Sequence, residues 1–211
     1  MLVKRIRALA LASALVVWSL VAPRLPSRWH PVTHSVAAAA LAALARAPLG
    51  LRPPQSWSGV RLGLAAAAPV ALGVAVATGL PQVRDEMAKR DLPDGPLRWL
   101  LLGIPLGTVW SEEAAYRAAL GTVAADAFGP TAGRLLQSVA FGLSHIADAR
   151  STGEPFVPTV LVTGVAGWVF GRLYEHSGSL IAPMLAHLAV NEAGALAALA
   201  VQMTAVDPDS V

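Results

Sequence analysis

The chain has 211 residues, of which 55% are hydrophobic and only 14% carry a charge, against roughly 25% charged residues in a typical soluble domain. Because its uncharged runs are long enough to cross a bilayer, the composition predicts a polytopic, all-α integral membrane protein and excludes a soluble fold. The lack of cysteine excludes disulfides and thiolate chemistry, and a net charge of only +3, on basic residues that stand singly at the ends of apolar runs, predicts contact with lipid headgroups and no nucleic-acid partner.

The N-terminal part, residues 1–97, is expected to hold three membrane helices and a polar loop. Its first apolar run, residues 6–22, follows three basic residues, as the core of a signal peptide would. The length of the run and the lack of a small-x-small cleavage site favour a membrane helix instead. Further helices are expected over residues 32–47, where the hydrophobicity is marginal, and 62–80. Residues 82–96 carry both signs of charge and predict a loop or a surface helix.

A C-terminal membrane core is expected over residues 98–203, followed by a short acidic tail at residues 204–211. Four apolar runs should cross the membrane in this core: residues 98–125, 131–147, 156–174 and 179–203. The whole chain should therefore hold about seven membrane helices, within a range of six to eight because prolines interrupt the longer runs.

Two of these runs carry small residues at helical spacing, which allows neighbouring helices to approach closely. The first is the pair Gly103 and Gly107, shortly before the charged motif. The second is the row Gly164, Gly167 and Gly171.

The basic residues of the loops differ little in number between the two sides of the membrane. An N-terminus in the cytoplasm places eight of them inside and seven outside, so the bias is nearly flat. Because the first helix usually dominates the orientation, the basic residues that precede it predict a cytoplasmic N-terminus.

Three charged side chains interrupt the apolar run that begins at Arg98: Glu112, Glu113 and Arg117. A charge near the middle of a membrane helix costs roughly 2.5 to 3.5 kcal/mol on insertion scales, so these groups must face a polar interior. Glu113 and Arg117 stand at i, i+4 and are expected to form a structural ion pair. Glu112 is rotated by about 100° from Glu113 and is left as a candidate functional carboxylate.

Two later runs carry further polar groups, His145 on one and His187 with Asn191 on the other. The last two are spaced i, i+4 and share a helix face, so all three could meet Glu112 in one site. A carboxylate beside imidazoles can activate water, with His or Asn donating to the oxyanion. Glu112, His145 and His187 could equally hold a divalent metal such as zinc, and the spacing leaves both chemistries open.

The chain carries three short motifs in this order: Glu112-Glu113-x-x-x-Arg117, Phe141-x-x-x-His145 and His187-x-x-x-Asn191. Together they resemble the motifs of the CPBP intramembrane proteases, the family that includes the CAAX prenyl endopeptidases. The resemblance covers roughly residues 99–199. Family members commonly have phenylalanine, glycine and a small or amide residue where this chain has Tyr116, Ala118 and Glu192, and these departures bear on substrate preference.

The resemblance implies that Glu112 with His145 activates the attacking water, and that His187 with Asn191 stabilises the oxyanion or helps to hold a metal. The expected activity is hydrolysis of a peptide bond in or near the membrane, with a membrane protein or peptide as substrate and the lipid bilayer as surroundings. The alternative is a non-enzymatic scaffold, immunity factor or carrier that retains the polar cluster for binding or ion passage. The alanine-rich, lysine-poor composition predicts a bacterial plasma membrane.

Overall fold

The structure, a computed structural model, describes residues 1–24 and 30–205. All of the regular secondary structure in these ranges is helical, which confirms the all-α prediction. The acidic tail expected at residues 204–211 lies outside the described residues from position 206 onward.

Within the described residues, four helices are long and apolar enough to cross a membrane, judged by length and composition: Leu2–Arg24, Gln55–Ala77, Phe156–Ser177 and Ile181–Thr204. In the secondary structure they correspond to α1 (Leu2–Val21) with a short 3-10 extension, α3 (Gln55–Ala77), α9 (Phe156–Ser177) and α10 (Ile181–Ala205). The expected total of about seven is not confirmed. The other apolar segments are shorter or carry charges.

One shorter apolar helix is α2 (His30–Leu44), whose 15 residues would extend only about 22 Å against a hydrocarbon core of about 30 Å. The polar stretch expected to be a loop or surface helix contains α4 (Pro81–Lys89). The amide of Gln202 ties the end of α4 to α10 by donating hydrogen bonds to the carbonyl oxygens of Met87 and Arg90, at 3.1 and 2.7 Å.

The motif run is nearly continuous from α5 (Pro96–Arg98) to α6 (Gly121–Phe128), as the sequence predicts. Between them lie two π-helical segments, η3 (Trp99–Trp110) and η4 (Glu113–Leu120). Ser111 and Glu112 form the α-helical junction between these segments. Because π-helical turns commonly occur at functional sites, this junction is a candidate position for one.

The next apolar run differs from its predicted bounds. Helix α7 (Pro130–Ser144) ends three residues before the expected end at residue 147, and a separate helix, α8 (Ile146–Thr152), follows it. The helix is interrupted at His145, whose φ is −86° and whose ψ is 3°. This sparsely populated backbone region is one in which active-site residues are often found.

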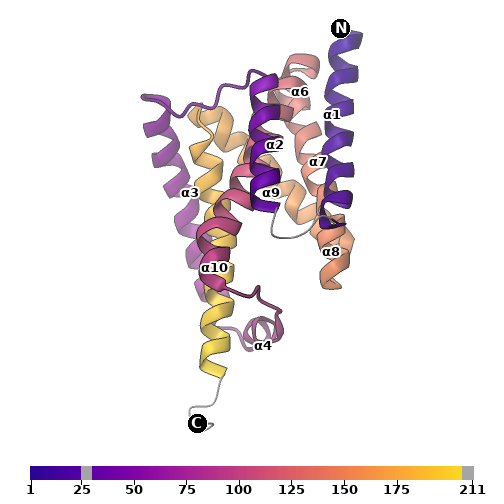
Figure 1. The fold of residues 1–211 in the computed structure, drawn as a ribbon. Helices are drawn as coiled ribbons and strands as arrows, with labels where there is room; N and C mark the ends of the chain where they lie inside the picture. Colours follow the sequence, from indigo (N-terminus) through magenta and orange to yellow (C-terminus); the bar gives the residue numbers. More distant parts are fainter. Residues whose placement is uncertain (25–29, 206–211) are drawn as a thin grey trace.

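Helices α3 and α9 pack against α10, and α7 packs against α9 (Figure 1). The predicted small-residue row lies at the second contact, where the nearest heavy atom to a Cβ added at Gly167 would be Cδ1 of Phe141, at 2.9 Å. A Cβ added at Gly107 would likewise lie 3.3 Å from the Cα of Pro31 in α2. Gly103 instead faces Trp99 of its own segment, so only half of the first predicted pair makes a helix contact.

Candidate active site

The segment η4 is buried along its whole length and holds the predicted ion pair. Arg117 Nε lies 3.1 Å from Glu113 Oε2, and both side chains are fully buried. The Arg117 guanidinium carbon also lies 3.9 Å from the ring centroid of Phe141 and 5.0 Å from that of Phe170. The buried cation is therefore stabilised by one carboxylate and two aromatic rings.

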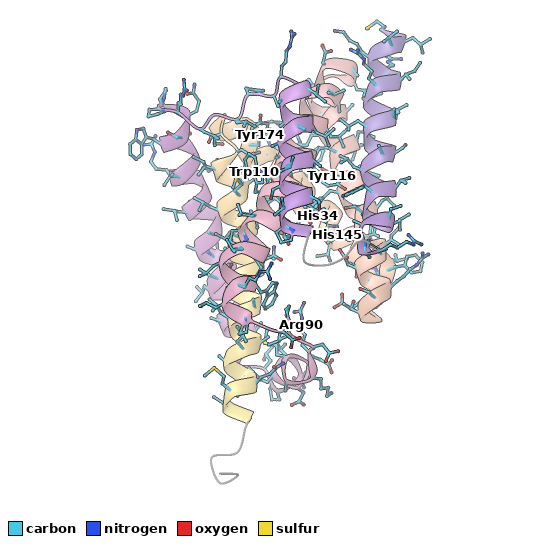
Figure 2. The ribbon with its side chains drawn as sticks, viewed as in Figure 1. His34, Arg90, Trp110, Tyr116, His145 and Tyr174 are labelled. Carbon is cyan, nitrogen blue, oxygen red and sulfur yellow. The ribbon has the colours of Figure 1, made fainter. Side chains whose placement is uncertain are left out.

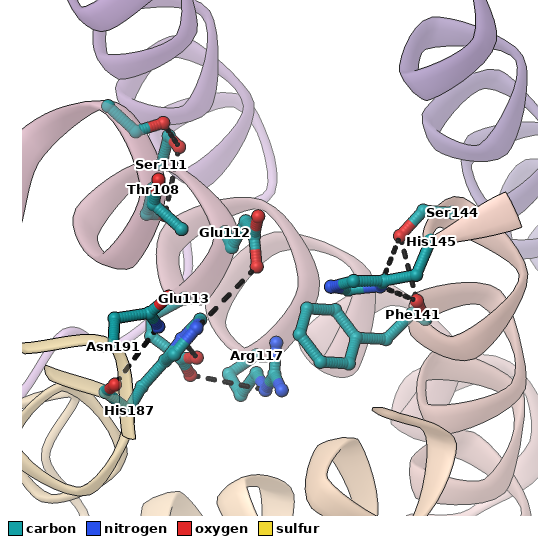
Figure 3. Close-up of polar contacts among 11 residues, drawn as sticks. Thr108, Ser111, Glu112, Glu113, Arg117, Phe141, Ser144, His145, His187 and Asn191 are labelled. Atoms are coloured by element: carbon teal, nitrogen blue, oxygen red, sulfur yellow. Dashed lines mark hydrogen bonds and ion pairs between the residues drawn. The ribbon is translucent and has the colours of Figure 1, made fainter. Parts of the chain in front are cut away.

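His187 connects α10 to this ion pair. Its Nδ1 lies 2.8 Å from Glu113 Oε1, and its ring stacks on Phe170 at a centroid distance of 5.0 Å. Because the Glu113 carboxylate is the counter-charge of Arg117, it accepts this hydrogen bond and Nδ1 donates. The other ring nitrogen, Nε2, lies 3.8 Å from Glu112 Oε2. The imidazole thus stands between two carboxylates (Figure 3).

Glu112 differs from Glu113 in both exposure and partners. Its side chain is 28% exposed, and its Oε2 has no hydrogen-bond partner among the described residues. Of the two carboxylates, Glu112 is therefore the one whose side chain is partly exposed and not paired with Arg117, as a general base requires.

His145 stands at the end of α7 with one ring nitrogen committed to the backbone. Its Nδ1 lies 2.8 Å from the carbonyl oxygen of Phe141. Because a carbonyl oxygen can only accept, Nδ1 carries the proton and Nε2 of the neutral ring bears a lone pair. Figure 3 shows the ring extending from α7 toward the side of the motif helix that carries Glu112.

The four candidate residues Glu112, His145, His187 and Asn191 line one cavity of about 2050 Å³. Its walls extend to His34 of α2 and to Arg90 after α4, both labelled in Figure 2. The structure therefore brings the three predicted motifs together. The contact that Glu112 makes within the set is with His187, rather than with its expected partner His145.

Asn191 Nδ2 donates to the carbonyl oxygen of His187 at 3.1 Å, which uses one of its two amide protons. Asp148 of α8 also lines the cavity. Burial raises the pKa of the Asp148 carboxyl above its usual value, and the nearby His145 partly opposes this rise.

The two serines next to motif residues donate to backbone carbonyls of their own helices. Ser111 Oγ lies 2.6 Å from the carbonyl oxygen of Gly107, and Ser144 Oγ lies 2.8 Å from that of Phe141. A hydroxyl nucleophile needs a base within hydrogen-bond reach. Ser144 Oγ is 3.4 Å from His145 Nδ1, the nitrogen that already carries a proton.

The metal-binding alternative calls for Glu112, His145 and His187 to converge as ligands. Within residues 1–24 and 30–205, no three His, Cys, Asp or Glu side chains are grouped closely enough to hold a metal ion. The expected ligand set is thus not assembled in this arrangement.

Sequence reasoning missed the aromatic surroundings of the site. The motif includes Phe141 but does not predict its ring contacts, which are with Tyr116 and His145 at centroid distances of 5.2 and 4.7 Å. Phe170 of α9 was not singled out, although it contacts both Arg117 and His187. The one available signal was its position beside the small-residue row, because Gly167 and Gly171 flank it in the sequence.

The family model described as type II CAAX prenyl endopeptidase Rce1-like matches residues 94–193 of the chain. This span includes all four candidate residues together with Glu113 and Arg117, and it excludes α1, α2 and α3. The comparisons with curated proteins and with solved structures give no match.

Proposed function

We propose that this chain, whose residues 94–193 belong to the family of Rce1-like type II CAAX prenyl endopeptidases, uses Glu112 to activate a water molecule for hydrolysis of a peptide bond. The match to this family supports an intramembrane protease. The catalytic type and the roles of the individual residues are the proposal. The substrate is a membrane protein or peptide whose scissile bond reaches the cavity.

One observation carries the proposal. Glu112 lies on the wall of the cavity with its Oε2 lacking a hydrogen-bond donor among the described residues, whereas Glu113 is committed to Arg117 and His187. A general base must be free to accept a proton, and Glu112 meets that requirement. Ser111 and Ser144 are weaker candidates for the attacking group, because their hydroxyls donate to backbone carbonyls of their own helices.

The mechanism follows from the positions of these groups. The Glu112 carboxylate accepts a proton from water, and the water oxygen attacks the carbonyl carbon while the carbonyl electron pair moves to oxygen. The Nε2 lone pair of His145 accepts a hydrogen bond from the same water and orients it. When the intermediate collapses, the C–N bond breaks and the leaving nitrogen takes the proton from Glu112.

The developing oxyanion requires hydrogen-bond donors that are already in place. In our proposal His187 in its protonated form supplies Nε2–H, and the second amide proton of Asn191 supplies the other donor. Glu113 keeps the His187 ring oriented by accepting the hydrogen bond from Nδ1. This arrangement gives Glu113 a positioning role in addition to its pairing with Arg117.

The experiment compares new protein N-termini in membrane fractions of cells that express the wild-type chain, Glu112→Gln or Glu154→Gln. Loss of a general base typically lowers the rate by about 10² to 10⁴, so the N-termini produced by the wild type should disappear in Glu112→Gln. Glu154→Gln is the matched control, because it makes the same chemical change at an exposed residue outside the cavity lining, and it should retain them.

The same assay on His145→Ala and His187→Ala should also show loss of cleavage, with Asn191→Ala less complete because it removes one oxyanion donor of two. Ser111→Ala and Ser144→Ala should remain active. Full cleavage by Glu112→Gln together with an inactive Ser144→Ala would overturn the mechanism in favour of a serine nucleophile. If no N-terminus depends on any of these residues, the non-enzymatic scaffold or carrier takes its place.

A further inference from the structure

A second cavity, of about 820 Å³, lies between α3 and α9 and shares no residue with the one that holds the candidate catalytic groups. One face of each helix lines it, from Ser58 to Ala65 on α3 and from Trp168 to His176 on α9. Both helices are among the four that can cross a membrane, and they pack against each other. The cavity therefore extends along the membrane-facing part of the bundle.

The lining changes from basic to apolar along the helix axes. Arg61, Arg172 and His176 lie within two turns of the start of α3 or the end of α9. Leu62, Ala65 and Val169 follow at greater depth. Because basic side chains at the ends of membrane helices reach the headgroup region, the basic part of the cavity stands at headgroup level and the apolar part at acyl-chain level.

The basic part of the cavity, formed by Arg61, Arg172 and His176, has more positive charge than the neighbouring carboxylates neutralise. Glu175 contacts Arg134 and also lies 3.5 Å from Arg172 Nη1, so one carboxylate serves two guanidinium groups. His176 Nε2 accepts a hydrogen bond from Arg172. Arg61 has no acidic partner among the described residues. Arg61, Arg134 and Arg172 together have two more positive charges than Glu175 neutralises. Guanidinium groups are well suited to bind phosphate oxygens.

We propose that this cavity binds one anionic phospholipid, with its phosphate between Arg61 and Arg172 and an acyl chain along Leu62, Ala65 and Val169. The lipid would fill the space between α3 and α9. A free phosphate would satisfy only the basic part.

The test uses the full-length chain, purified in a neutral detergent, and native mass spectrometry to count bound lipid. The probes are dioctanoyl phosphatidylglycerol, dioctanoyl phosphatidylcholine and glycerol phosphate, which separate an anionic lipid from a zwitterionic one and from a phosphate without acyl chains. The main variant is Arg61→Gln, whose side chain has no acidic partner to lose. Arg7→Gln is the matched control, since Arg7 is exposed in the second turn of α1 at the same end of the molecule (Figure 1).

A basic residue near an anionic surface contributes enough to change binding about fivefold. We therefore expect Arg61→Gln to weaken phosphatidylglycerol binding about fivefold and Arg61→Gln with Arg172→Gln about 25-fold. Arg7→Gln should leave it unchanged, and melting without lipid should show that Arg61→Gln folds normally.

Three results would overturn the inference. Equal losses of phosphatidylglycerol binding in Arg7→Gln and Arg61→Gln would indicate a general electrostatic attraction to the basic surface. Equal affinity for glycerol phosphate and phosphatidylglycerol would indicate a phosphate site without a lipid. Equal binding of phosphatidylcholine and phosphatidylglycerol would show that the positive charges do not select the ligand. None of these measurements depends on proteolysis, so they are independent of the proposed activity.

Discussion

Adjacent glutamates in this chain occupy different environments because consecutive helical positions face different directions. Glu113 is fully buried between Arg117 and His187, whereas Glu112 is 28% exposed on the cavity wall. One carboxylate therefore serves the fold and the other remains available for chemistry. This difference can be tested by making the same substitution at each position.

We expect Glu113→Gln to lower the stability of the protein, because the Arg117 guanidinium loses its counter-charge while remaining buried. Breaking such a pair costs about 3 to 5 kcal/mol. Thermal melting of the purified variant in detergent measures the loss, and poor expression would accompany it. Activity should fall too, since His187 loses the acceptor that orients its ring.

Glu112→Gln is the control for this substitution, and it should melt close to the wild-type temperature while losing activity. Its carboxylate makes no hydrogen bond through Oε2 to the described residues, so little structure depends on its charge. If Glu112→Gln proved unstable and Glu113→Gln stable and inactive, the structural and catalytic roles would have to be exchanged.

At the scale of elements, the contact between α7 and α9 positions the aromatic rings of the site. Gly142 lies one residue after Phe141, and a Cβ added there would stand 2.6 Å from the carbonyl oxygen of Val160. That oxygen belongs to the backbone of α9 and cannot move aside without moving the helix. Close approach at Gly142 therefore keeps Phe141 of α7 against Gly167 of α9.

Gly142→Ala should destabilise the protein by about 1 to 3 kcal/mol, the usual cost of overpacking a well-packed contact. Melting in detergent is again the measurement. Gly73→Ala in α3 is the matched control, because no heavy atom lies within 4 Å of a Cβ added there. Since alanine favours a helix over glycine by up to about 1 kcal/mol, this control should melt at the same temperature or higher. Equal melting of the two variants would show that α7 and α9 do not pack as described.

At the scale of the whole molecule, the proposed orientation depends on the basic residues before α1. Helices α1 and α3 begin at the same end of the bundle (Figure 1), so a cytoplasmic N-terminus places the start of α3 in the cytoplasm and α4 on the opposite side. The chain has no cysteine, so single introduced cysteines can report each side without background.

We expect an impermeant maleimide to label Gln82→Cys in intact cells, and to label Gln55→Cys only after permeabilisation. Both positions are exposed glutamines, and they flank α3 on opposite ends. Labelling of Gln55→Cys alone in intact cells would reverse the orientation.

The sequence alone was sufficient for features that depend on local spacing. The all-α membrane class follows from long uncharged runs, and the Glu113–Arg117 pair follows from the i, i+4 relation, because a helix brings residues four apart to the same face. The gathering of Glu112, His145, His187 and Asn191 around one cavity was also predicted, from their placement on apolar runs and from the resemblance of the motifs.

Only the tertiary structure decided which of these groups touch. Glu113 and His187 are 74 residues apart, and periodicity within a helix contains no information about the distance between two helices. The same holds for Phe170, which reaches Arg117 from α9. The interruption of the helix at His145 and the π-helical segments around Glu112 also depend on packing, since tertiary contacts override local propensity. The sequence therefore determined which residues could act, and the packing of α7, α9 and α10 around η4 determined their partners.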